Sequence, residues 1–319
     1  MAGRTSCCFC YGHTGSGKTH TILGYGPEKG IFTRAAEDLC MAFGGKSCPP
    51  GVKICVRFAE LHNQRVYDLL SNREECQIRE GEDGEMHIRK DTQVLANGRI
   101  RVEPLAERRC TTPIDVNRAV AEAVRLRAVG SSSLHDQSSR SHAILQLEIA
   151  TDDMLAAREE VLIAESEFRK NAGPYAIRKA GEALAAARGA ADLAQMQGPS
   201  FAGGRLVFVD LAGAEYGSET VAREQKQTPQ ELREAKEINT SLLALKEVIR
   251  ALGDRSQGRV PFRSSKLTML MRRHLLGQDS STCMIANASP SSEHCTKSVN
   301  TLSYAQLVAQ ASRKRSTRA

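Results

Sequence analysis

Residues 12–19 read Gly12-His13-Thr14-Gly15-Ser16-Gly17-Lys18-Thr19 and fit the pattern G-x-x-x-x-G-K-[ST] at every fixed position. Glycines let the backbone turn tightly, so that several N–H groups point inward at a phosphate. The lysine of this pattern reaches the outer phosphates of a nucleotide, and the final hydroxyl lies on Mg²⁺. Residues 7–11 predict a buried strand before the loop, and residues 21–23 predict the opening of a helix after it. This strand–loop–helix order argues against the alternative, a glycine-rich turn that matches by chance.

Two further polar motifs lie next to apolar runs. Ser138-Ser139-Arg140-Ser141-His142 precedes a predicted strand at residues 143–149. Asp210-Leu211-Ala212-Gly213-Ala214-Glu215 follows a predicted strand at residues 205–209. In phosphate-loop NTPases such an Asp orients Mg²⁺, usually through water, and the Gly N–H meets the γ-phosphate. D-x-x-G alone is common, but beside the phosphate loop and a Ser/Arg cluster it predicts a nucleotide-sensing site.

Length and composition are those of a soluble protein with one large or two ordinary domains. The chain has 319 residues, of which 41% are hydrophobic and 25% charged. No apolar run is long enough to span a bilayer, and residues 7–11 are too short for a signal peptide, so we expect a cytosolic protein. The formal charge of +7 permits an acidic partner, whether nucleic acid, anionic lipid or an acidic protein surface.

The ten cysteines are expected to be buried, reduced thiols and not zinc ligands. Most of them lie in apolar, strand-like surroundings, namely Cys7, Cys8, Cys10, Cys55 and Cys283.

The remaining pattern alternates helical and strand-like segments, which predicts an α/β fold. Helices are predicted at 32–43, 112–129, 229–252, 266–275 and 297–311, and strands at 52–61 and 283–288. Residues 151–200 interrupt this pattern with two predicted helices, 152–170 and 175–196. We expect this hairpin to project from the sheet edge with its ends close together, and we expect the basic tail 313–319 to be unfolded.

Six stretches in this order resemble the kinesin motor domain: GHTGSGKT, SSRSH, DLAGAE, EINTSLLALKEVIRAL, VPFRSSKLT and NTLSYA. The resemblance covers about 7–150 and 200–311, and details at 243–253 and Cys295 are more similar to the internal-motor, microtubule-depolymerising kinesins. It implies a motor domain over 1–312, with a central mixed β-sheet flanked by helices on both faces and a helical insertion at 151–200.

The resemblance also implies an ATP hydrolase that uses ATP and Mg²⁺. The nucleotide would be held by Gly12, His13, Thr14, Gly15, Ser16, Gly17, Lys18, Thr19 and His20, with His20 near the adenine. Mg²⁺ would lie at Thr19, Ser139 and, through water, Asp210. Catalysis would rest on Ser139, Gly213 and an Arg140–Glu215 salt bridge that closes around ATP. The alternative for these two charges is an ordinary surface pair.

The resemblance implies that the partner is the microtubule, and not nucleic acid or a membrane. A microtubule partner in turn implies a location on the cytoskeleton in the cytoplasm. The contact surface would comprise Lys246, Arg250, Arg259, Arg263, Lys266, Arg272 and Arg273. A solvated basic face is the alternative. The sequence leaves open the direction of movement, walking as against depolymerisation, and the oligomeric state.

The chain departs from the family pattern in three ways. The family begins before the phosphate loop, with a strand that carries R-x-R-P; we expect that strand to be missing beside residues 7–11, which would leave an exposed apolar edge. His135 and His62 stand where the family usually has Asn and Tyr. The insertion at 151–200 has no counterpart. A microtubule-binding or structural protein that has lost ATP turnover is therefore an alternative, whereas a small GTPase is disfavoured because no N-K-x-D motif is present.

Overall fold

The computed structural model describes residues 4–43, 51–81, 84–96, 98, 100–129, 139–170, 174–214, 228–253, 259–276 and 280–316. Its strands are β1 Thr5–Tyr11, β2 Gly24–Tyr25, β3 Glu28–Lys29, β4 Val52–His62, β5 Arg65–Asp68, β6 Glu74–Glu80, β7 Met86–Val94, β8 Ile100–Pro104, β9 Arg108–Cys110, β10 His142–Thr151, β11 Arg205–Asp210 and β12 Ser280–Ala286. The α-helices are α1 Lys18–Leu23, α2 Ile31–Phe43, α3 Pro113–Val129, α4 Asp152–Lys170, α5 Pro174–Gln197, α6 Pro229–Gly253, α7 Lys266–Leu276 and α8 Cys295–Ser316. A short 3₁₀ helix, η2, spans Phe262–Ser264.

A mixed sheet runs through the middle of the molecule in the order β12-β1-β11-β10-β4-β5-β6-β7-β8, with β9 paired to β4. β1 is parallel to both of its neighbours, β11 and β12, whereas β10 is antiparallel to β11 and β4. The expectation that β1 would lie at an exposed edge is therefore wrong. The register pairs of Cys8 are Phe208 on one side and Cys283 on the other, so within the described residues β12 forms that edge.

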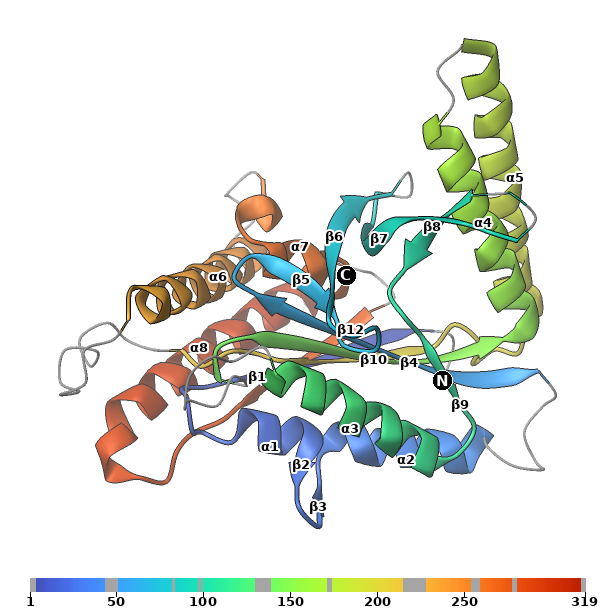
Figure 1. Ribbon diagram of the computed structural model, residues 1–319. Coiled ribbons are helices and arrows are strands. Elements are labelled where there is room, and N and C mark those ends of the chain that lie inside the picture. The colour runs from blue at the N-terminus through green and yellow to red at the C-terminus, as the bar shows by residue number, and fades with distance from the viewer. Residues whose placement is uncertain are drawn as a thin grey trace.

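Helices cover both faces of this sheet, as expected, because its central strands are apolar on both sides. The side chains of β11 alternate between the two faces of the sheet, and each face has its own hydrophobic core. Val207 and Val209 pack with α6, α7 and α8 on one face, while Phe208 packs with α1, α2 and α3 on the other. Figure 1 shows α1–α3 below the sheet and α6 and α7 above it. Within the described residues, no helix combines the length and apolar character needed to cross a bilayer.

Capping residues in the sequence set the starts of helices α3 and α6. Thr112 and Asp115 exchange backbone and side-chain hydrogen bonds of 3.1 and 3.3 Å at the start of α3. Thr228 and Glu231 do the same at 2.9 and 3.3 Å at the start of α6. Such reciprocal bonds satisfy the free N–H groups of a first turn, and so these starts were predictable.

Both ends of β12 and of α8 differ from the predicted bounds, 283–288 and 297–311. β12 begins at Ser280 and not at Cys283, because pairing with β1 extends the strand through polar residues that carry little strand signal. α8 continues to Ser316, so the first four residues of the expected basic tail are helical. Helix propagation from the packed part of α8 explains this extension, since adding residues costs less than starting a helix.

The helical hairpin α4–α5 connects the neighbouring strands β10 and β11, and its ends are close together, as expected. Ile149 donates to the carbonyl of Gly204 at 3.0 Å and accepts from the N–H of Gly203 at 2.8 Å. The hairpin was expected to project from the sheet edge, but the two strands that it connects are central strands of the sheet. The two helices extend away from the sheet (Figure 1). The hairpin is nevertheless packed on the rest of the molecule, because α4 contacts β8 and the α4 side chains Met154 and Ile163 are buried.

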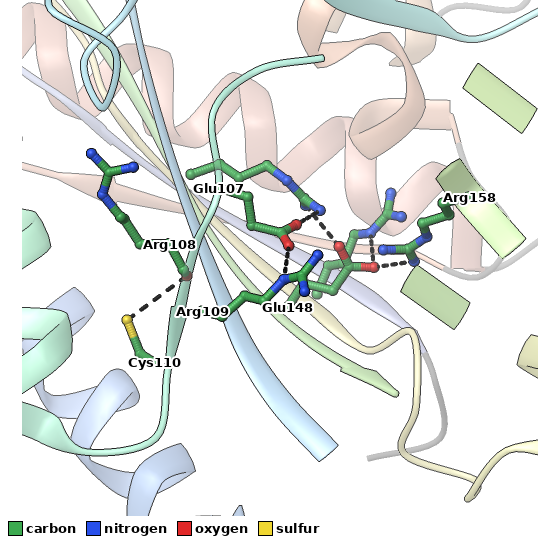
Figure 2. Close-up of polar contacts among 8 residues, drawn as sticks. Glu107, Arg108, Arg109, Cys110, Glu148 and Arg158 are labelled. Carbon is green, nitrogen blue, oxygen red and sulfur yellow. Dashed lines mark hydrogen bonds and ion pairs between the residues drawn. The ribbon is translucent and has the colours of Figure 1, made fainter. Parts of the chain in front are cut away.

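A buried carboxylate joins this hairpin to the sheet (Figure 2). Glu148 of β10 is fully buried and accepts hydrogen bonds from Arg57 of β4 at 2.7 Å, Arg205 of β11 at 2.9 Å and Arg158 of α4. Burial favours the neutral form of Glu148, but the guanidinium groups of Arg205, Arg57 and Arg158 hold its pKa well below the ordinary value. The charged Glu148 therefore links the second turn of α4, through Arg158, to β4 and β11, through Arg57 and Arg205. We call this group of four side chains the Glu148 clamp.

Candidate functional site

The phosphate loop lies between β1 and α1 and has the backbone that its glycines predict. Gly15 and Gly17 have φ angles of 80° and 90°, the left-handed region that glycine adopts without a steric penalty. Gly12 cannot carry a side chain for another reason: a Cβ there would lie 2.4 Å from the carbonyl oxygen of Asn287. These positions fix the narrow turn around which a phosphate would be held.

Lys18 is folded back over this loop. Its buried ammonium donates to the carbonyl oxygens of Gly12 at 3.0 Å and His13 at 2.8 Å. Ser16 Oγ is also buried, and it has no hydrogen-bond partner within the described residues. A cation and a free hydroxyl at one narrow loop fit the oxygens of a bound phosphate.

Thr19 and Asp210 meet at the end of β11, as the two motifs predicted. Thr19 Oγ1 donates to Asp210 Oδ2 at 2.7 Å. Asp210 is fully buried, and its Oδ1 has no hydrogen-bond partner in the described part of the chain. A hydroxyl and a carboxylate oxygen are ligands of the kind Mg²⁺ prefers, so the residues present fit that ion.

The three motifs converge on one another. Gly213 donates its N–H to the carbonyl of Ser139 at 3.0 Å, and Ala214 donates to the carbonyl of Gly12 at 3.2 Å. A Cβ on Gly213 would lie 2.0 Å from Thr14 Oγ1. The loop after β11 can therefore lie this close to the phosphate loop only because residue 213 is a glycine. We call residues 138–142 the first switch motif and residues 210–215 the second switch motif. In this arrangement the Gly213 N–H, which was expected at the γ-phosphate, is bound to the Ser139 carbonyl of the first switch motif.

Arg140 has partners that the sequence did not indicate. Its guanidinium lies 3.3 Å from Glu231 Oε1 and 3.3 Å from Glu234 Oε2, both in the first turns of α6. The expected partner, Glu215, lies outside the described residues, as do Ser138 and His135.

The sequence analysis missed two residues that contact the candidate site. Arg127, at the end of α3, donates to Asp210 Oδ2 at 2.8 Å and also to the Oγ and the carbonyl of Ser141. It therefore orients the carboxylate that would face the metal. A basic residue in the last turn of an amphipathic helix is too common to have singled Arg127 out.

His142 was quoted within its motif but given no role. Its Nδ1 accepts the N–H of Ala212 at 3.0 Å, and its Nε2 lies 2.8 Å from Ser241 Oγ. Since that hydroxyl donates to the carbonyl of Ile238 at 2.7 Å, the proton on the ring is at Nε2. Burial, with Arg127 and Lys18 nearby, lowers the pKa of His142 to about 3, and the neutral ring joins the Asp210 loop to α6.

His20 stands at the mouth of an open cleft of about 740 Å³. Thr21, Glu28 and Arg34 are among the other residues that line this cleft. His20 is half-exposed, and its Nε2 lies 2.9 Å from Glu28 Oε2. The ring therefore borders open space, and its position near an adenine stays a prediction.

Of the seven residues expected on the basic surface, six have accessible side chains on α6, η2 and α7 or just before η2. Exposed members are Arg250, Arg259, Arg263 and Arg273, and half-buried members are Lys266 and Arg272. Lys246 points inward, because its ammonium lies 5.5 Å and 5.4 Å from the ring centres of Tyr11 and Tyr304. Lys246 is therefore removed from the expected surface, and its cation is held by aromatic faces.

Arg263 and Arg272 share a carboxylate. Glu80, at the end of β6, lies 2.8 Å from the Arg263 guanidinium and 3.6 Å from that of Arg272. The Arg263 side chain is well exposed and that of Arg272 is partly exposed, so this pairing contributes little to stability and leaves both accessible.

Comparisons with known proteins agree with this geometry. The family model described as the kinesin motor domain matches residues 1–311. The kinesin-like protein KIN-13B of Arabidopsis thaliana is 35% identical over 301 residues, which are 94% of this chain and 34% of that protein. The chain thus spans about a third of the length of this relative.

Solved kinesin structures resemble this fold. A fast kinesin, described with its ATPase mechanism and its interactions with microtubules, has a TM-score of 0.66 and 25% identity, covering 96% of this chain and 71% of that one. A KIF14 dimer with AMP-PNP in complex with a microtubule has a TM-score of 0.65 and 25% identity, covering 96% and 72% of the two chains.

Proposed function

The chain belongs to the kinesin motor-domain family, and we propose from this that it is a microtubule-binding ATP hydrolase. Its turnover would drive movement along microtubules or their depolymerisation, and it would act on the cytoskeleton in the cytoplasm. The observation that carries the proposal is the meeting of three distant motifs: Thr19 contacts Asp210 at 2.7 Å, and the Gly213 loop touches the phosphate loop. We also propose that 1–312 form one motor domain, with 151–200 inserted in it and a basic tail at 313–319.

The proposed substrate complex is ATP with Mg²⁺. Residues 12–19 would hold the phosphates, and His20 would lie beside the adenine. Thr19, Ser139 and Asp210 would hold the ion, Asp210 through water, with Arg127 fixing the Asp210 carboxylate. Bound Mg²⁺ would neutralise charge on the phosphate oxygens. The chain's own contribution is to position these groups and exclude bulk water, since phosphoryl transfer needs little covalent help from the protein.

Hydrolysis would depend on Arg140 and Glu215 acting as a pair, with Ser139 and Gly213 placing the two loops. Support comes from the present contacts of Arg140 with Glu231 and Glu234, which tie the first switch motif to α6. Closing onto Glu215 would require Arg140 to exchange these partners. Nucleotide state would then reach α6, the longest helix of the proposed microtubule surface, through an exchange of ion pairs.

The test is single-turnover ATP cleavage with and without microtubules, comparing wild type with Arg140→Ala, Glu215→Ala and the double variant. We expect ATP binding to persist and cleavage to fall in both single variants, because the pair serves the transition state more than the ground state. The double variant should lose little more than either single one.

Additive losses, or normal cleavage in one single variant, would contradict the pairing. Microtubule co-sedimentation without any phosphate release in the wild type would contradict the hydrolase and favour a binding protein that has lost turnover.

A further inference from the structure

Two thiols lie next to each other where β1 meets β12. Cys8 and Cys283 are register partners in this parallel pair of strands, so their side chains leave the same face of the sheet. Cys283 is exposed and Cys8 is half-buried, and neither is in a disulfide. The expectation that Cys283 is a buried thiol is therefore wrong, because β12 is the edge strand of the described sheet.

We propose that Cys8 and Cys283 are a redox modification site that closes into a reversible disulfide with a low-molecular-weight disulfide as the oxidant. Paired strands lie about 4.8 Å apart, and the Cα atoms of disulfides lie about 4.4 to 6.8 Å apart. The strands therefore hold the two residues within bridging distance. Strand pairing leaves the side chains little freedom to relax, so the bridge would be easily reduced, as strained and exposed disulfides are.

The neighbouring cysteines do not offer the same pairing. Cys10 shares the face of Cys8 but is buried, and its register partner on β12 is Ile285. Cys7 faces the opposite core, with α6, α7 and α8, so the Cys7-x-x-Cys10 spacing separates its two thiols across the sheet. Burial raises the pKa of both Cys7 and Cys10, which makes them poor nucleophiles.

The order of attack follows from exposure. Burial and the adjacent Cys283 raise the pKa of Cys8 to about 11, so the exposed Cys283 reacts first. The Cys283 thiolate attacks one sulfur of the oxidant, forms a mixed disulfide and releases one small thiolate. Cys8 then loses its proton to water and attacks the Cys283 sulfur, releasing the second small thiolate. Two protein thiols are oxidised, and one small disulfide is reduced to two thiols.

The bridge would act on the phosphate loop, a consequence that rests on the proposed function. β1 runs directly into Gly12, and β12 runs into Asn287, which donates its N–H to the Tyr11 carbonyl at 2.8 Å. The Asn287 amide also donates to Thr21 Oγ1 of α1 at 2.8 Å. Gly12 also packs closely against the Asn287 carbonyl, since a Cβ on Gly12 would lie only 2.4 Å from that oxygen. A shift of β12 relative to β1 would therefore be transmitted to the phosphate loop. The Cα atoms of disulfides are most often about 5.5–6 Å apart, so closing the bridge should change the spacing of β1 and β12, displace the loop and weaken nucleotide binding.

The direct test is mass spectrometry of the full chain after exposure to oxidised glutathione, digested without reduction. Trypsin cleaves after Lys and Arg, so it releases Cys8 in peptide 5–18 and Cys283 in peptide 274–297. We expect these peptides to be linked, with a loss of about 2 Da for the two hydrogens removed, and dithiothreitol to separate them. Cys8→Ser and Cys283→Ser should each abolish the link. The matched controls Cys10→Ser and Cys295→Ser should keep it, since they change other thiols of the same two peptides.

Three results would overturn the proposal: no link in the wild type, a link that survives Cys283→Ser, or glutathione retained on Cys283 without a bridge. Calorimetry with AMP-PNP and Mg²⁺ then reports the consequence, a loss of affinity on oxidation that dithiothreitol reverses and Cys283→Ser prevents. If protein with the Cys8–Cys283 disulfide fully formed bound AMP-PNP as tightly as the reduced protein does, the proposed effect of the bridge on the phosphate loop would be wrong. Reduced protein that binds no nucleotide would contradict the proposed function while leaving the peptide link as an independent result.

Discussion

At the scale of single residues, the nucleotide site depends on side chains held by more than one element. His142 uses both ring nitrogens to connect the Ala212 backbone with Ser241 of α6. Lys18 is held by the carbonyls of its own loop. Both side chains are buried, so a substitution that breaks one of these hydrogen bonds leaves a polar group without a partner inside the protein.

Acid should destabilise the protein through its buried histidines. Burial lowers the folded-state pKa of His142 to about 3 and of His274 to about 4, from an ordinary 6.5. Below about pH 6.5 the unfolded chain takes up protons that the folded chain refuses, so stability falls as pH falls, until the folded pKa values are reached. Between pH 6.5 and pH 5 each histidine should contribute a loss of about 1.6 kcal/mol.

The measurement is urea unfolding at several pH values in this window. His142→Gln should flatten the pH dependence because it removes one titrating group, whereas His20→Gln, at a half-exposed ring, serves as the control. An equally steep pH dependence in wild type and His142→Gln would contradict the assignment.

Lys18→Ala should remove nucleotide binding, because the phosphates would lose the cation at the loop. We expect at least about a tenfold loss in affinity for ATP with Mg²⁺, which is about 1.4 kcal/mol, measured by calorimetry. Lys179→Ala, at an exposed lysine of α5, should bind as the wild type does. Thr19→Ala should retain binding but weaken its dependence on Mg²⁺. Unchanged affinity in Lys18→Ala would show that the loop does not hold the nucleotide.

At the scale of elements, the hairpin α4–α5 is attached through charge as well as apolar contact. Glu148 is buried beneath three guanidinium groups, and one of them, Arg158, belongs to the hairpin (Figure 2). Removing one partner leaves the carboxylate buried with fewer hydrogen bonds, which costs more than the loss of an exposed pair. The hairpin is thus coupled to β4 and β11, although the sequence suggests an appended arm.

Arg158→Ala should lower the free energy of unfolding by about 1.5–3 kcal/mol, as expected for a hydrogen bond to a buried charge. The matched control is Arg178→Ala in α5, whose exposed side chain lies 3.9 Å from Glu182 and should contribute about 0–1 kcal/mol. Urea unfolding followed by circular dichroism measures both. Equal stability of the two variants would show that the clamp contributes nothing beyond a surface pair.

At the scale of the whole molecule, basic side chains of α6, η2 and α7 gather on one helical layer, while the phosphate loop lies at the end of β1. Arg140 and His142 both connect the switch motifs to α6. The proposed ATP site and microtubule surface therefore share one helix, which gives nucleotide state a short physical route to the partner.

Microtubule binding should weaken as salt is added, because exposed charges are screened beyond about 10 Å at 0.1 M ionic strength. Arg263→Glu combined with Lys266→Glu should reduce co-sedimentation while leaving ATP affinity in place. Lys179→Glu, at an exposed lysine of α5, is the control for charge reversal on another face. If the double variant sedimented with microtubules as well as the wild type does, the basic surface would be placed wrongly.

The sequence by itself determined the features that depend on neighbouring residues. The phosphate loop, the capping boxes at Thr112 and Thr228, and most helices and strands follow from short-range spacing and backbone preferences. The convergence of Thr19 with Asp210 was also predictable, because both motifs lie at strand ends and their chemistry requires the same ion.

Only the tertiary structure decided which distant groups meet. β12 pairs with β1, Arg127 reaches Asp210 across 83 positions, Lys246 turns inward, and Cys8 meets Cys283. Local preferences carry no information on such contacts, because sheet order and helix packing are set by the burial of apolar surface over the whole chain. A charged or thiol side chain then takes its role from what that packing places beside it, and its own sequence neighbours do not reveal the partner.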